Sequence, residues 1–140
     1  NILKENNLVD INKFKLLCNN VPFIRSLGFE TLNSLEGYLF PETYFLSKDQ
    51  NEKEIIQMMI NQFNKTVKKL NIDNEFNFSI HDILIFASIV QGEARLINEM
   101  KIISSVFYNR INRNMYLDAN ATIQYIIPGK NRRLINKKCP

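Results

Sequence analysis

Three stretches in which an apolar residue recurs about once per helical turn constrain the fold of this chain more than any other feature. Residues 51–70 place five apolar side chains on one helical face: Ile55, Met59, Phe63, Val67 and Leu70. The same spacing recurs over residues 79–94 and 98–113. A period near 3.6 does not fit a strand, whose side chains alternate with a period of two. The sequence therefore predicts a mostly helical protein.

Capping residues set the expected helix starts. Asn51 with Glu54, and Ser79 with Asp82, have the spacing of a capping box. Asp10 can cap a short helix near the start of the chain. The run 19–22 contains Pro22 and is expected to end that helix, with residues 23–29 irregular.

The segment 35–44 has a different character. It reads LEGYLFPETY, dense in aromatic residues, with Gly37 near one end and Pro41 in its middle. This composition favours a loop or an edge strand over a helix.

Composition and charge exclude several classes of protein. Of the 140 residues, 45% are hydrophobic and 23% are charged, which excludes a disordered or fibrous chain. No apolar run is long enough for a membrane span or a signal peptide, and the chain is expected to be a fragment. The net charge of +4 is concentrated in the last eleven residues, and no recognition motif accompanies it, so nucleic acid is not expected as a partner.

The cysteines and the single histidine give no support to metal or cofactor chemistry. Cys18 and Cys139 lie at opposite ends of the chain, and His81 stands at a helix start, where a polar residue is ordinary. There is no phosphate-binding glycine motif and no HExxH. No cofactor and no metal are predicted.

Glu93 is the most informative carboxylate. Helical periodicity places it along the edge of the apolar face that includes Phe86 and Val90. Poor solvation disfavours the charged form of a carboxylate, and a general acid at neutral pH requires this. The alternative is that the helix ends here and Glu93 simply reaches solvent.

Four blocks together suggest a family. They are the segment 35–44, then ASIVQGEA at 87–94, SVFYNR at 105–110, and the stretch 117–125. In order and spacing they resemble the segments that mark the endolytic murein transglycosylases of the YceG-like (MltG) family.

This resemblance implies an α+β fold whose present fragment is mostly helical. Residues 1–34 would be the end of a LysM-like subdomain, and residues 35–140 the first part of a catalytic domain whose C-terminal part is missing. It further implies a single-pass anchor in the bacterial cytoplasmic membrane, absent from this fragment, with the catalytic domain facing the cell wall. Peptidoglycan glycan strands would be the substrate, and peptidoglycan synthases the partners.

The implied reaction cuts the β-1,4 bond between N-acetylmuramic acid and N-acetylglucosamine without water and leaves a 1,6-anhydro end. Ordinary glycosidases use two carboxylates. Here the sugar's own C6 hydroxyl is the nucleophile, so Glu93 can act first as the acid and then as the base.

The chain departs from the family pattern at two positions. Many relatives have Glu where this chain has Gln91, and Asp where it has Asn120. Glu93 is therefore assigned as the catalytic residue. The polar residues expected to hold the sugar are Glu36, Tyr38, Gln91, Asn109, Asn120, Thr122 and Tyr125.

Each of these residues also has a structural interpretation. Tyr38 and Tyr125 could be core aromatics, Asn109 a helix cap or cross-link, and Glu36 an ion-pair partner of a Lys or of Arg110. For Arg110 itself, a structural salt bridge is favoured over a substrate contact.

Three other functions remain open. A hydrolase would pair Glu93 with Glu36 or Asp118, and an inactive glycan-binding scaffold is suggested by Gln91. The third is a basic helical module that binds nucleic acid, which would lose affinity steeply with salt.

Overall fold

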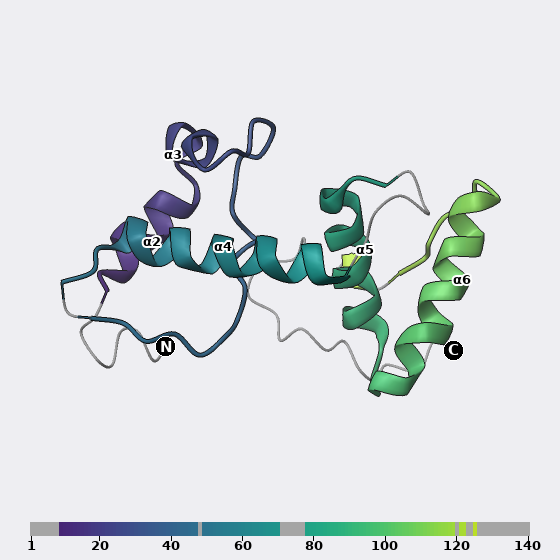
Figure 1. The fold of residues 1–140 in the computed structure, drawn as a ribbon. Coiled ribbons are helices and arrows are strands. Elements are labelled where there is room, and N and C mark those ends of the chain that lie inside the picture. Colours follow the sequence, from purple (N-terminus) through teal and green to yellow (C-terminus); the bar gives the residue numbers. More distant parts are fainter. Residues whose placement is uncertain (1–8, 48, 71–77, 120, 123–124, 126–140) are drawn as a thin grey trace. The chain divides into compact units, whose positions relative to one another are not determined.

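The computed structural model describes residues 9–47, 49–70, 78–119, 121–122 and 125 (Figure 1). The chain divides into two compact units, Asn1–Glu75 and Phe76–Pro140. Within the described residues every regular element is a helix, which confirms the mostly helical prediction, and the expected α+β class and LysM-like segment stay predictions. The boundary expected after residue 34 also stays a prediction; Leu32 and Leu35, on either side of it, are both buried in the first unit.

The first unit begins with two short helices, α2 (Ile11–Cys18) and α3 (Val21–Ser26). Asp10 caps α2 through the amides of Asn12 and Lys13, as expected. The prediction that residues 23–29 are irregular is wrong for the span to Ser26. Asn20 caps α3, and Pro22 lies in its first turn, where the missing N–H costs no helical hydrogen bond. The first helix ends at Cys18, directly before the run 19–22, as expected, but Pro22 also lies in the first turn of a new helix.

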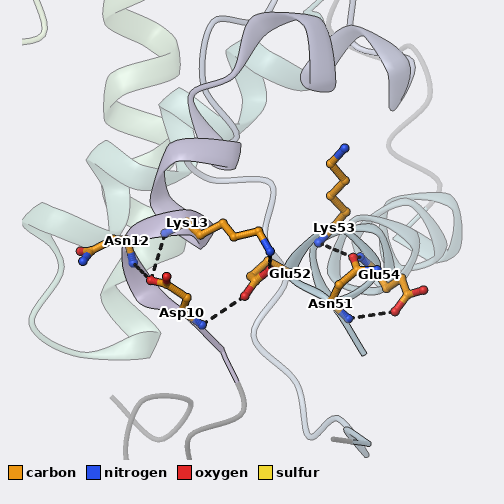
Figure 2. Close-up of polar contacts among 7 residues, drawn as sticks. All are labelled: Asp10, Asn12, Lys13, Asn51, Glu52, Lys53 and Glu54. Carbon is orange, nitrogen blue, oxygen red and sulfur yellow. Dashed lines mark hydrogen bonds and ion pairs between the residues drawn. The ribbon is translucent and has the colours of Figure 1, made fainter. Parts of the chain in front are cut away.

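The long helix α4 (Glu52–Leu70) confirms the first periodic stretch. Its start follows the predicted capping pattern. The Asn51 side chain accepts from the amides of Lys53 and Glu54, and the Glu54 carboxylate accepts from the Asn51 amide at 3.0 Å (Figure 2). Three backbone donors at the helix start are thus satisfied by the side chains of Asn51 and Glu54.

The core of the first unit joins α3, α4 and the segment 35–44. Four of its side chains are almost entirely buried: Ile24, Leu35, Ile56 and Ile60. The segment 35–44 is a turn followed by an extended loop, so the loop alternative is the one observed. Its start is fixed by the Leu35 amide, which donates to the Cys18 carbonyl at 2.9 Å, and Gly37 takes a φ of +84°, which suits glycine.

An ion pair ties α2 to the start of α4. Lys13 Nζ lies 2.6 Å from Glu52 Oε2, while Oε1 of the same carboxylate accepts from the Asp10 amide at 3.2 Å (Figure 2). The hydrogen bond with Lys13 lowers the pKa of Glu52 below its ordinary value, and the same bond raises the pKa of Lys13. Glu52 is buried although it is charged, and this pairing is what makes its burial tolerable.

We expect this ion pair to make the stability of the first unit depend on acid. A lowered carboxyl pKa stabilises the fold above the unfolded-state pKa, and this contribution is lost as the pH falls through the lowered value. Glu52→Gln should therefore lower the thermal midpoint at pH 7 and flatten its decline below about pH 5. Thermal unfolding across pH, with the exposed Glu30→Gln as the charge-matched control, measures both effects. Equal pH profiles for the two variants would contradict the prediction.

The second unit consists of α5 (Ile80–Glu93), the short 3-10 helix η1 (Ile97–Glu99) and α6 (Met100–Asn112). Ser79 and Asp82 form the predicted capping box at the start of α5. Helix α6 packs beside α5 (Figure 1). Val90, Phe107 and Ala119 are the buried centre of this unit. The loop after α6 thus returns to the core that α5 and α6 share.

No helix in the described parts of the chain combines the length and the apolar character that crossing a bilayer would require.

Candidate active site

Glu93 is the last residue of α5, and its side chain is half-buried. The helix ends at this residue, as the alternative interpretation had it, but the carboxylate does not simply extend into solvent. The Ala121 amide donates to Glu93 Oε1 at 2.7 Å, across 28 positions of sequence. One oxygen of the carboxylate is thus held by the backbone.

The hydrogen bond has an electrostatic reason. The C-terminal end of a helix carries the negative end of the helix dipole, so it is an unfavourable place for a carboxylate. A backbone N–H directed at the carboxylate offsets part of this cost. The donor lies in the helical turn that contains Ala121 and Thr122, and Thr122 donates from Oγ1 to the Ala119 carbonyl at 2.6 Å.

Gly92 lets this turn come close to α5. A Cβ built at Gly92 would lie 2.7 Å from the Ala121 Cβ, closer than two carbon atoms that are not bonded can approach. Gly92 is helical and has no positive φ that would itself require glycine. Its role here is therefore steric.

Arg110 organises the loop that leads to the turn. Its Nη1 donates to the carbonyls of Tyr116 and Leu117, at 3.3 and 2.8 Å, and forms an ion pair with Asp118 at 3.2 Å. Asp118 has a φ of +50°, a backbone conformation that residues other than glycine rarely adopt. The predicted structural salt bridge of Arg110 is confirmed, with Asp118 as its partner.

The remaining candidate residues fall into two groups. In the second unit, Gln91 on α5 and Asn109 on α6 are exposed, as are Thr122 and Tyr125. Asn120 lies outside the described residues. Glu36 and Tyr38 belong to the first unit, where Glu36 is exposed.

Tyr38 is only 4% exposed. Its ring packs against Phe29 and Phe63, with centroids 5.0 and 5.1 Å away. These contacts match the core-aromatic interpretation that the sequence left open, and they occupy the ring with protein side chains.

Sequence reasoning missed Ala121 and Gly92. Ala121 acts through its backbone amide, for which a sequence carries no signal. Gly92 did carry one, because a glycine inside a helical pattern is unfavourable and commonly has a packing reason. In the described parts of the chain, no three His, Cys, Asp or Glu residues gather as metal ligands.

Comparison with known proteins yields consistent matches. The sequence profile of the YceG-like family matches residues 2–139. A Bacillus subtilis protein named endolytic murein transglycosylase is 37% identical over 105 residues, which is 74% of this chain and 29% of that protein. A Streptococcus pneumoniae protein of the same name is 35% identical over 92 residues, which is 65% of this chain and 17% of that protein.

This chain thus spans less than a third of the length of these relatives. No solved structure matches it. The profile match covers both units and includes Glu93, Gly92 and the turn that contacts them, and on this evidence the chain belongs to the YceG-like family.

Proposed function

We propose that this chain contributes the catalytic acid of an endolytic peptidoglycan lytic transglycosylase, and that Glu93 is that acid. The observation that carries the proposal is the half-buried Glu93 carboxylate, held at Oε1 by the Ala121 amide. The names of the relatives support the activity and the glycan substrate.

The chemistry requires one carboxyl group used twice. The protonated Oε2 of Glu93 donates its proton to the glycosidic oxygen as the bond from C1 of N-acetylmuramic acid to that oxygen breaks. The C6 hydroxyl of the same sugar then attacks C1, and Glu93, now ionised, accepts its proton. One C–O bond breaks and one forms, no water is consumed, and Glu93 ends protonated as it began. The product is a 1,6-anhydro end.

The exposed polar residues of the second unit are proposed to hold the sugar: Gln91, Asn109, Thr122 and Tyr125. Asn120 and Glu36 are proposed as further contacts, because acetamido and hydroxyl groups need fixed donors and acceptors. For Tyr38, burial against Phe29 and Phe63 supports a structural role: its ring anchors the segment 35–44 in the core of the first unit. A membrane anchor outside this chain and peptidoglycan synthase partners complete the proposal.

One alternative function has an observation in its favour, and a second has an observation against it. Gln91 stands where many family members have a carboxylate, which favours an inactive glycan-binding scaffold. A hydrolase would use a second carboxylate near Glu93. Asp118 is the candidate in the same unit, but its carboxylate pairs with Arg110, so this pairing disfavours the hydrolase.

Product analysis tests the three functions. Full-length protein incubated with uncrosslinked glycan strands is expected to release internal fragments with 1,6-anhydro-muramic ends, detected by mass spectrometry as a loss of one water relative to a reducing end. Reducing ends would instead establish a hydrolase. Strands that are bound but remain uncut, under conditions where a related enzyme cleaves them, would establish the scaffold.

A further inference from the structure

The contact between the end of α5 and the turn at Ala121 has a consequence for the reaction. Glu93 Oε1 is held by the amide of Ala121, and the position of that amide depends on the residue beside Glu93. A Cβ at position 92 would meet the Ala121 Cβ at 2.7 Å, whereas the Ala121 Cα would lie at an ordinary contact distance of 3.8 Å. The conflict is therefore between two methyl groups.

We infer that Gly92 is a positioning residue for Glu93: its missing side chain lets the Ala121 turn approach α5 closely enough to fix one carboxylate oxygen and leave the other for the substrate. This inference rests on the proposed role of Glu93. It adds that the orientation of the acid is set by a steric fit between two small residues and a backbone amide.

Residues that precede Ala121 restrict how far this turn can move. Ala119 is buried against Val90 and Phe107, and Arg110 holds the carbonyls just before it. An added methyl group at position 92 therefore cannot be accommodated by a loose loop. The turn must shift as a body, and its amide shifts with it.

Helix propensity predicts the opposite effect. Alanine is a better helix former than glycine, so Gly92→Ala should favour α5 in isolation. A loss of activity in this variant would thus not come from a weaker helix. This makes the substitution a selective probe of the contact.

We expect Gly92→Ala to lower kcat by about 10- to 100-fold with KM changed less than about threefold, because a misplacement of the acid near 1 Å costs this much. The compensating change is Ala121→Gly, which removes the opposing methyl group and keeps the amide. Combined with Gly92→Ala, it should restore most of the kcat that the single Gly92→Ala variant loses.

A second measurement follows the amide itself. In the wild type, the proton resonance of the Ala121 amide should move with pH as the Glu93 carboxylate is protonated. This response should be lost in Gly92→Ala and return in the double variant. Glu93→Gln, which has no titrating carboxyl, supplies the baseline.

The outcomes separate this inference from the proposed function. Full activity of Gly92→Ala, or a defect that Ala121→Gly does not repair, overturns the inference even if Glu93→Gln is inactive. Cleavage by Glu93→Gln overturns the catalytic assignment, and the amide response then decides by itself whether Gly92 places the Ala121 turn.

Discussion

Glu93→Gln is expected to lower the rate of glycan cleavage at least about a thousandfold, because a single carboxyl group would supply both the acid and the base. Glutamine keeps an acceptor for the Ala121 amide, so the fold of the site should persist while proton transfer is lost. The rate of formation of new anhydro ends measures the effect. A matched thermal midpoint for both proteins shows that the loss is chemical.

Gln91 provides the matched control. It lies two positions before Glu93 on the same helix and is exposed. Gln91→Ala should change the rate less than about tenfold, as expected for a residue that only contacts the sugar. Adding Gln91→Glu to Glu93→Gln should not restore cleavage. Restoration would place the acid at position 91 and make the natural chain the inactive scaffold.

Tyr38→Ala is expected to lower the free energy of unfolding by about 3–5 kcal/mol, the usual loss for a buried aromatic side chain. The ring is 4% exposed and packs against Phe29 and Phe63, so its removal leaves a cavity. Urea unfolding measures the loss. Phe45→Ala, seven positions along the chain and 95% exposed, should change the stability by no more than about 0.5 kcal/mol.

Comparing Tyr38→Ala with Tyr38→Phe distinguishes the two roles that the sequence left open for Tyr38. Tyr38→Phe keeps the ring, so it should retain most of the stability and leave KM for glycan unchanged. If Tyr38→Ala instead kept its urea midpoint and raised KM, the ring would be a sugar contact and not part of the core.

The helices were predictable because the signals that set them are local. The apolar spacing of residues 51–70 and the Asn51–Glu54 cap predicted α4, and Ser79 with Asp82 predicted the start of α5. The end of α2 before the run 19–22 was predictable in the same way, whereas α3 was not expected. Proline is favoured in the first turn of a helix, and Asn20 caps the helix that contains Pro22.

The sequence by itself determined which carboxylate to consider, because helical periodicity places Glu93 at the edge of an apolar face and one of the four blocks that resemble the YceG-like family contains it. Only the tertiary structure decided how that carboxylate is held. Its donor is the backbone amide of Ala121, 28 residues away. The burial of Ala119 and the missing side chain of Gly92 let this amide approach. A backbone amide is common to almost every residue type, so no pattern of side chains reveals which one approaches. That choice depends on how closely two segments distant in sequence can pack.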